Sequence, residues 1–205
     1  MITVATMLWD ANTNSHNFSS MYNEEWVNRL YQGFARNLTQ PWQFVCYTDR
    51  PRSFGWPIIQ RQIQSPTPSY GDFTQPYELG DPMILVGLDT VVTGNVDHLA
   101  DYALSMDRIA LPQAIYAPNT CCNGVALVPK GHRHIWTQWR GENDMEWLRS
   151  KPHAYIDDLF PGHVVSYKGH VKDCGLGDAR IVFFHGEEKP HQLPSGHMLR
   201  SAWEG

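Results

Sequence analysis

Four polar residues in this sequence stand directly after apolar runs, where side chains with a chemical role are often placed. They are Asp10, Asp49, Asp89 and His185. In open α/β sheets, ligands bind in the crevice beyond the carboxyl ends of the strands. A carboxylate at the end of a buried strand is costly unless it faces solvent, a partner or a metal. The pattern therefore predicts a ligand site at these strand ends, with a turn or helix-capping aspartate as the alternative for Asp89.

Asp89 lies within the most informative segment, residues 83–99, which reads MILVGLDTVVTGNVDHL. This segment resembles the metal-binding signature of the glycogenin-like glycosyltransferases, which are enzymes of the GT-A type. In that signature an apolar strand leads to D-x-D-T, two apolar residues and a G/A-N-[ILV]-D-x-L turn. Asp89 matches the second aspartate, and Gly87 stands where the first would be. A nucleoside diphosphate could make up the metal coordination that Gly87 leaves short.

Several other segments resemble a small bacterial and phage branch of the same superfamily, in order along nearly the whole chain. They are Thr6–Trp9 (TMLW), Phe44–Asp49 (FVCYTD), Cys122–Val125 (CNGV), Asn143–Leu148 (NDMEWL), Val165–Lys168 (VSYK) and Phe183–Pro190 (FFHGEEKP). Each match is weak by itself. The run F-H-G-x-x-K-P behind an L-D-T strand and an N-G-V turn is more specific, so we predict membership of this superfamily.

The resemblance implies an enzyme that moves a sugar from a nucleoside-diphosphate sugar, of UDP type, to an acceptor, with retention at the anomeric carbon. The acceptor stays open among glycan, protein and nucleic acid, as does the oligomeric state. Departure of the nucleotide places negative charge on the β-phosphate, which a hard divalent cation neutralises. The expected cofactor is Mn²⁺ or Mg²⁺, held by Asp89 and His185. In the family the metal histidine stands at the position that Phe183 occupies in this chain. His185 is therefore chosen because it is adjacent to Gly186, and His191 is the alternative ligand.

The resemblance also implies residues for the donor and for catalysis. Those expected to bind the donor are Thr6, Trp9, Asp10, Tyr22, Asp49, Thr90, Gly186 and Lys189. Those expected in catalysis are Asp144, Lys189 and Asn123. Lys189 would pair a phosphate as a point charge, and Asp144 would orient sugar hydroxyls or stabilise an oxocarbenium-like centre. The alternatives are a solvated lysine, a helix N-cap for Asp144 and a turn residue for Asn123.

Hydrophobic periodicity predicts the elements that must position these residues. Ile2–Leu8 and Trp42–Thr48 read as strands, and between them Asn23 caps a helix whose apolar residues recur at helical spacing up to Leu38. Strand, helix and strand make the βαβ unit of a parallel sheet. Met83–Leu88 is continuously apolar, as a strand covered on both faces must be.

The remaining assignments complete an α/β fold. Further strands are expected at Ile58–Ile63, Gly124–Val128 and Ile181–Phe184, a short helix at Asp144–Arg149, and otherwise loop over Arg50–Pro82. The loops Asn12–Ser20 and Gly71–Gly80 are expected to cover the site. We expect one GT-A-like domain over residues 1–194, with a mostly parallel central sheet flanked by helices, and a loosely packed C-terminal tail over residues 195–205.

Composition limits the class of partner. The chain has 205 residues and carries 16 basic against 21 acidic residues, a net charge of −5, without a run of lysine or arginine. This argues against a general nucleic-acid binder. No apolar run approaches the roughly 20 residues of a membrane span, and the N-terminus lacks a basic leader, so we expect no membrane span and a cytoplasmic location. The four cysteines are expected to be reduced.

Two other functions fit parts of the sequence. Gly87 is compatible with a catalytically inactive protein of the same fold that binds nucleotide sugars or glycans. The ten histidines suggest a second alternative function, that of a metal-dependent hydrolase. That second reading is weakened because no H-E-x-x-H pair occurs, and the one H-x-H, His132 and His134, lies in a loop without nearby carboxylates.

Overall fold

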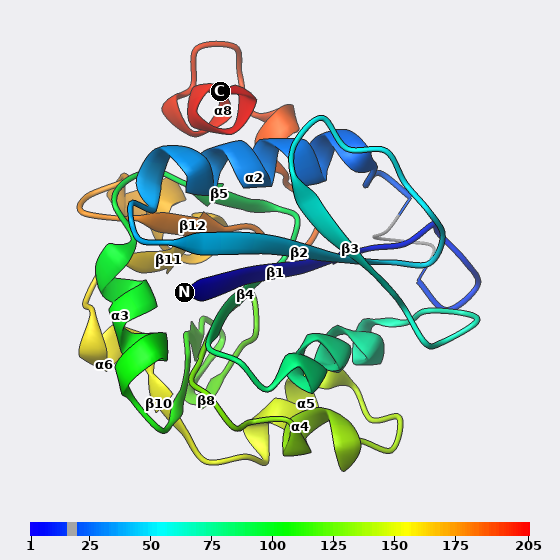
Figure 1. Ribbon diagram of the computed structural model, residues 1–205. Helices are drawn as coiled ribbons and strands as arrows, with labels where there is room; N and C mark the ends of the chain where they lie inside the picture. The colour runs from blue at the N-terminus through cyan, green and yellow to red at the C-terminus, as the bar shows by residue number, and fades with distance from the viewer. Residues whose placement is uncertain (16–19) are drawn as a thin grey trace.

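The computed structural model of the protein describes residues 1–15 and 20–205, and its centre is a seven-stranded sheet (Figure 1). In spatial order the strands are β10 (His153–Tyr155), β6 (Ile109–Leu111), β9 (Val125–Val128), β4 (Met83–Val86), β1 (Ile2–Leu8), β2 (Trp42–Thr48) and β3 (Ile58–Gln62). β9 runs antiparallel to both of its neighbours, and the other neighbouring pairs are parallel. The predicted α/β fold with a mostly parallel central sheet is confirmed.

Helices cover both faces of this sheet. They are α2 (Glu24–Asn37) and α3 (Asp97–Ser105) on one face, and the 3₁₀ helix η1 (Tyr70–Leu79), α4 (His134–Thr137) and α5 (Asp144–Arg149) on the other (Figure 1). Successive side chains of a strand point to opposite faces. Ile2 and Val4 accordingly join the core with α2 and α3, whereas Ala5 joins the core with η1, α4 and α5. Both faces are covered, so β1 and β4 are buried along their whole length, and β4 is continuously apolar.

Helix α2 begins and ends where the sequence predicts. The Asn23 side chain accepts a hydrogen bond from the Glu25 backbone N–H at 3.1 Å, and acidic residues occupy the first turn, where the helix dipole favours negative charge. Trp26, Leu30 and Phe34 are buried on one face of the helix. β1 and β2 pair in parallel along their full length. The predicted βαβ unit is therefore confirmed.

A second sheet brings the C-terminal part of the chain to the end of β4. Its strands, in spatial order, are β11 (Val164–Ser166), β12 (Ile181–Phe183) and β5 (Thr90–Val92). β12 pairs antiparallel with β5, and the Phe184 backbone N–H donates to the Asp89 carbonyl at 3.1 Å. The chain that leaves β12 therefore starts beside Asp89, although the two are far apart in the sequence.

The remaining elements are short. They are β7 (Gln113–Ala114), β8 (Ala117–Cys121), α6 (Ile156–Leu159), the π-helical turn η2 (Tyr167–Val171), α7 (Lys172–Cys174), η3 (Pro190–Gln192) and α8 (Met198–Glu204). β7 and β8 form an antiparallel hairpin, which contributes residues to the pocket described below.

The structure differs from the sequence-based expectation in three places. Residues 50–82 contain η1 in addition to β3, because 3₁₀ turns accommodate the proline and glycines that suggested a loop. β4 ends at Val86 rather than Leu88, since the chain turns there into β5. The expectation of a loosely packed tail was wrong: α8 packs on α2, with Leu199 wholly buried and Trp203 6% exposed.

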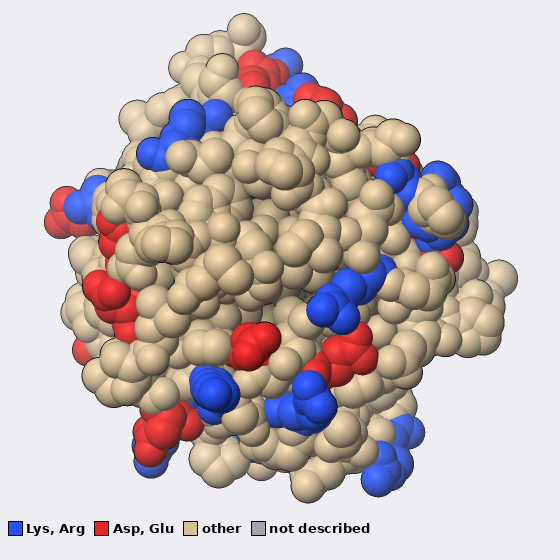
Figure 2. All heavy atoms as spheres, in the orientation of Figure 1, with Lys and Arg blue, Asp and Glu red and all other residues tan. Residues whose placement is uncertain are grey.

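The distribution of charged side chains on the surface (Figure 2) agrees with the absence of a lysine or arginine run in the sequence. On the face shown in Figure 2, lysine and arginine are interspersed with aspartate and glutamate, and no basic patch occurs there. Within residues 1–15 and 20–205, no helix has the length and apolar character that a membrane crossing requires. The cysteines are unpaired, as expected. Residues 16–19 of the expected covering loop Asn12–Ser20 lie outside the described residues.

Candidate functional site

A pocket of about 550 Å³ opens at the carboxyl ends of β1 and β4. Its walls come from the end of β1, the turn after β4, helix η1, the β7–β8 hairpin, the start of α5 and the loop after β12. Ligands of such sheets bind at this edge. Of the site residues expected from the sequence, the pocket brings together Trp9, Tyr22, Asp89, Asn123, Asp144, His185, Gly186 and Lys189.

Asp89 and Lys189 form a buried ion pair in this pocket. The Lys189 ammonium donates to Asp89 Oδ2, and the Tyr22 hydroxyl donates to the same oxygen at 3.1 Å. The exposed fraction is 3% for the lysine side chain and 15% for the aspartate. Burial, and then the charge of Asp89, raises the pKa of Tyr22, so its hydroxyl keeps the proton that it donates. The alternative of a solvated Lys189 was therefore wrong.

Two glycines shape the backbone around this pair. A Cβ at Gly87 would lie 2.9 Å from Asp89 Oδ1, so any side chain there would require the carboxylate to shift. Gly186 has a φ of +71°, in the left-handed region that favours glycine. It turns the chain from β12 toward Lys189, whose backbone N–H donates to Gln192 Oε1 at 2.8 Å. The Gly186 turn and the Gln192 hydrogen bond thus hold the backbone of Lys189 in position.

His185 lies in the same pocket, two residues after the end of β12. Its Nε2 lies 3.0 Å from Ser166 Oγ. Burial, together with the charges of Lys168 and Lys189, lowers the pKa of His185, which favours the neutral imidazole. A neutral imidazole is the form that binds metals.

The donors gathered here do not fit a preformed divalent-metal site. In the described part of the chain, no group of three or more His, Cys, Asp or Glu side chains is placed to hold a metal. Mn²⁺ and Mg²⁺ prefer oxygen-rich sites that include carboxylates. Asp89 supplies one carboxylate where the family motif has two, and it already contacts the Lys189 ammonium. Metal binding by Asp89 and His185 stays a prediction.

Asp144 presents a second carboxylate to the pocket. It is the first residue of α5 and is 9% exposed. The Asn123 amide donates to Asp144 Oδ2, and burial raises the pKa of Asp144. The helix N-cap is Asn143, whose side chain accepts from the backbone N–H of Met145, so the N-cap alternative for Asp144 was wrong. Asp144 is therefore not the N-cap residue, and its carboxylate lines the pocket.

Aromatic side chains line the pocket around these polar groups. Trp9 donates from Nε1 to Ser15 Oγ at 2.9 Å, and its ring meets Tyr70 edge to face with centroids 6.2 Å apart. On the β7–β8 hairpin, Tyr116 is 77% exposed, and its ring centroid lies 6.1 Å from that of His185. Aromatic faces stack on nucleobases and pack on sugar rings. The walls therefore suit a ligand with flat or ring-shaped parts.

Thr6 and Thr90 lie outside the pocket lining. Thr6 is wholly buried, and its hydroxyl donates to the Val86 carbonyl at 2.8 Å, which ties β1 to β4. The Thr90 hydroxyl is buried in β5 and has no hydrogen-bond partner within the described residues. Thr6 thus contributes to the sheet that carries the site.

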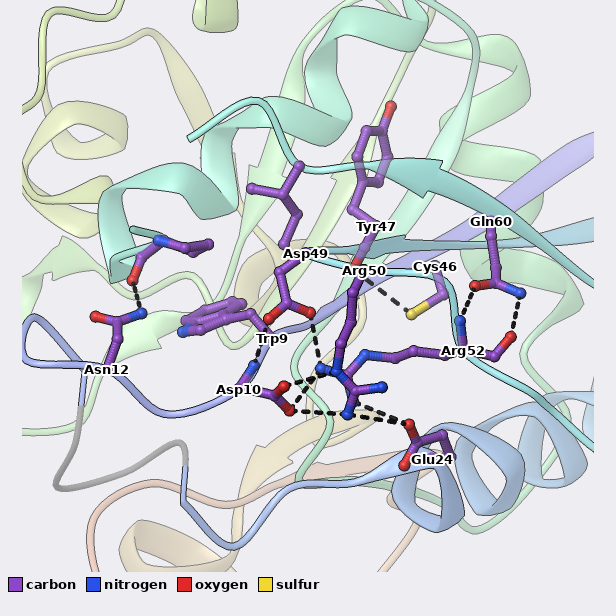
Figure 3. Close-up of polar contacts among 12 residues, drawn as sticks. Trp9, Asp10, Asn12, Glu24, Cys46, Tyr47, Asp49, Arg50, Arg52 and Gln60 are labelled. Atoms are coloured by element: carbon purple, nitrogen blue, oxygen red, sulfur yellow. Dashed lines mark hydrogen bonds and ion pairs between the residues drawn. The ribbon is translucent and has the colours of Figure 1, made fainter. Parts of the chain in front are cut away.

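Asp10 and Asp49 also lie outside the lining and belong to an ion-pair cluster (Figure 3). Arg52 Nη2 lies 2.9 Å from Asp10 Oδ1 and 2.7 Å from Asp49 Oδ1, and its Nη1 lies 3.0 Å from Glu24 Oε1. Arg50 Nε lies 2.6 Å from Asp10 Oδ2, and this hydrogen bond lowers the pKa of Asp10 to about 2. The cluster joins the ends of β1 and β2 to the start of α2.

His191, the alternative metal ligand, lies outside the lining as well. Its ring meets Trp26 edge to face, with centroids 5.3 Å apart, and lies 6.2 Å from Trp203. Of the two histidines considered from the sequence, His185 is the one that the fold brings into the pocket.

Several lining residues were not among the site residues expected from the sequence. These are Tyr70, Phe73, Ile115, Tyr116, Met145 and Arg149. Phe73 does lie in the expected covering loop Gly71–Gly80, and Met145 in the segment Asn143–Leu148. Tyr70 and Phe73 stand on η1, within a stretch rich in proline and glycine, and Tyr116 stands on a hairpin with very short strands. Both settings are too short or irregular for a detectable hydrophobic period.

No family model matches the sequence, and no curated protein matches it. Among solved structures the fold is similar to that of glycosyltransferases. Glycosyltransferase GlyE of Streptococcus pneumoniae TIGR4 matches with a TM-score of 0.62 at 14% identity, over 98% of this chain and 58% of that chain. An active-site mutant of LgtC matches with a TM-score of 0.60 at 10% identity, over 98% of this chain and 93% of that one.

The galactosyltransferase LgtC in complex with donor and acceptor sugar analogs matches with a TM-score of 0.56 at 10% identity, over 98% of this chain and 92% of that chain. The chain therefore spans about 58% of the length of GlyE and nearly the whole length of LgtC. At these identities the likeness shows the fold, and the GT-A-like architecture expected from the sequence is confirmed.

Proposed function

We propose that this protein is a glycosyltransferase that moves a sugar from a nucleoside-diphosphate sugar to an acceptor hydroxyl in the pocket described above. One observation carries the proposal: residues from separate sequence motifs, among them Asp89, Asp144 and Lys189, converge on one pocket at the strand ends of the sheet. The likeness of fold to glycosyltransferases supports it.

The nucleotide end of the donor fits the part of the pocket that holds Trp9 and Lys189. The aromatic wall formed by Trp9 and Tyr70 offers a surface for the nucleobase. The Lys189 ammonium offers hydrogen bonds to the diphosphate, whose negative charge grows as the bond to the sugar breaks. Because Lys189 is buried, its interaction with a phosphate is less screened by water than that of a surface lysine.

The sugar end of the donor fits the part of the pocket that holds Asn123 and Asp144. The Asp144 carboxylate accepts hydrogen bonds from sugar hydroxyls and stabilises positive charge that develops at the anomeric carbon. Asn123 donates to Asp144 and holds it in place. The acceptor hydroxyl must approach the anomeric carbon within the same pocket, where correct orientation of the two groups lowers the barrier.

Finer features of the proposal come from the sequence resemblance. They are the glycogenin-like specificity, the bacterial and phage branch, a UDP-type donor, retention of configuration and a cytoplasmic location. Manganese or magnesium at Asp89 and His185 likewise stays a prediction from the resemblance, and no step described here depends on it. The acceptor class and the oligomeric state stay open.

A second candidate function is a binding protein without catalysis. Gly87 favours it, because the chain lacks one carboxylate of the family motif. Such a protein would bind a nucleoside diphosphate or its sugar in the same pocket but would not release nucleotide from the donor.

A thermal-shift panel tests the proposal. UDP, GDP, ADP and CDP and their common sugar conjugates are added to the protein, with and without Mn²⁺. Binding to the native state raises the melting temperature, and ligand at about 100 times its Kd stabilises by about 2.7 kcal/mol. We expect one nucleotide and its sugars to raise the melting temperature. Release of that nucleotide from its sugar conjugate then separates enzyme from binding protein. No shift with any compound would contradict the proposal.

A further inference from the structure

We propose that the Lys189 ammonium takes the place of a divalent metal in this pocket, so that the protein binds the diphosphate of its donor without a metal ion. This inference rests on the proposed function and names the group that neutralises the diphosphate. It departs from the expectation drawn from the sequence resemblance, in which Asp89 and His185 hold Mn²⁺ or Mg²⁺.

The first argument is the position and burial of the charge. The Lys189 side chain is 3% exposed and lines the pocket, so its ammonium is a positive charge withdrawn from water. An ammonium has three N–H donors. Asp89 accepts one of them in the structure, which leaves donors for phosphate oxygens. A buried cation gains strongly from a second anionic partner because water does not compete for it.

The second argument is that the lysine is held in place before any ligand arrives. The left-handed Gly186 turns the chain after β12, and the Lys189 backbone N–H is bound by the Gln192 side chain at 2.8 Å. Pro190 then starts the short helix η3. Asp89 holds the other end of the lysine and is itself held by the Tyr22 hydroxyl at 3.1 Å. A charge fixed in this way stabilises a developing anion without reorganising.

The third argument is the shortage of carboxylates that would attract a metal. Among the described residues, the acidic side chains in the pocket lining are Asp89 and Asp144 and the lysine and arginine side chains are Lys189 and Arg149, so their numbers are equal. The position that would carry a further carboxylate is Gly87, and a Cβ there would lie 2.9 Å from Asp89 Oδ1. A divalent cation at Asp89 would share this carboxylate with the Lys189 ammonium and would be repelled by its charge. The pocket already holds the positive charge that the reaction requires.

Titration calorimetry with UDP, in buffer containing EDTA and in buffer containing Mn²⁺, tests the inference; if another nucleotide gave the largest thermal shift, its diphosphate is used instead. We expect the wild-type protein to bind with similar Kd in both buffers. Lys189→Met should weaken binding in EDTA by at least about tenfold, the effect of losing one charge-assisted hydrogen bond. Asp89→Asn should still bind UDP in EDTA, because the group that contacts the diphosphate is the Lys189 ammonium and not a metal held by Asp89.

Two further variants control this experiment. Lys172→Met makes the same charge change on a lysine that is 50% exposed, pairs with Glu188 and lies outside the pocket lining, so its affinity should equal that of wild type. If Lys189→Met fails to fold because Asp89 is left unpaired, the double variant Asp89→Asn with Lys189→Met removes both charges. It should fold and show the same loss of affinity in EDTA.

The outcomes separate this inference from the proposed function. Binding that needs Mn²⁺ and is lost in both EDTA and Asp89→Asn would overturn the inference and leave the glycosyltransferase proposal intact. Unchanged affinity in Lys189→Met would also overturn it. A protein that binds no nucleoside diphosphate or nucleotide sugar in either buffer would overturn the proposed function, and this inference with it.

Discussion

Asp144 carries a buried carboxylate whose hydrogen-bond partner is the amide of Asn123. Burial raises its pKa above the ordinary value of 3.8. As pH rises through that ordinary value, the unfolded chain loses this proton before the folded protein does. Ionisation of Asp144 therefore lowers the free energy of unfolding. The penalty is absent below the ordinary value and complete above the raised one. Such a residue is retained at some expense in stability, as expected of a group that meets a ligand.

The variant Asp144→Asn should reveal this penalty. Relative to wild type, its free energy of unfolding should increase as pH is raised from about 3 to about 7, because the amide does not ionise. Urea unfolding across this pH range measures the difference. Sugar transfer should fall by about 100-fold or more, since the carboxylate can no longer stabilise positive charge at the anomeric carbon. A stability difference that does not change with pH would contradict the assignment of the penalty to Asp144.

At the scale of elements, the ion-pair cluster links the ends of β1 and β2 to the start of α2 beside the pocket. Arg52 lies at its centre with a side chain that is 1% exposed, and it contacts carboxylates from all three elements. Arg50 contacts Asp10 from the outside and is 51% exposed. A buried arginine among three carboxylates fixes geometry, whereas an exposed ion pair contributes little. The two arginines therefore differ in importance although they are two residues apart.

This difference is testable with one substitution at two positions. Arg52→Met should lower the free energy of unfolding by on the order of 3 kcal/mol, because it leaves the carboxylates without their common partner. Arg50→Met, the matched control, should change it by less than about 1 kcal/mol. Urea unfolding at pH 7 and low salt compares them. Equal effects of the two substitutions would show that the cluster acts as a surface network instead.

At the scale of the whole molecule, the C-terminal helix α8 closes the core on the outer side of α2 (Figure 1). The centroid of the Trp203 ring lies 4.9 Å from that of Trp26, and the Arg29 guanidinium lies over the Trp203 ring, 4.0 Å from its centroid. Arg36 also donates to the Ala202 carbonyl at 2.8 Å. The helix contributes no residue to the pocket lining, so it acts on the fold as a whole.

Trp203→Ala should therefore destabilise the protein without changing its ligand binding. We expect a loss of about 3 to 5 kcal/mol, as for other large aromatic residues deleted from a core. Met198→Ala in the same helix, at a side chain 60% exposed, should cost less than about 0.5 kcal/mol. Thermal unfolding gives the stability and calorimetry the nucleotide affinity. A comparable loss in both variants would mean that the tail is held by its backbone rather than by Trp203.

The sequence by itself determined the elements whose signals are local. β1, α2 and β2 follow from an apolar strand pattern, an Asn23 cap and a helical period, all of which depend on neighbouring residues. It also selected Asp89 and Lys189, which share one pocket in the structure. Asp89 was selected because it follows an apolar strand at the edge of the sheet where ligands bind, whereas Lys189 was selected from its place in the F-H-G-x-x-K-P resemblance.

Only the tertiary structure decided which of these side chains contact one another. Lys189 reaches Asp89 because β12 pairs antiparallel with β5, and Asp10 and Asp49 are held by Arg52 rather than placed in the pocket. The helix α8 and the aromatic walls of the pocket were likewise decided by packing between distant segments. A short apolar or polar sequence pattern does not indicate which other segment it will pack against. Such contacts are therefore known only from the folded chain.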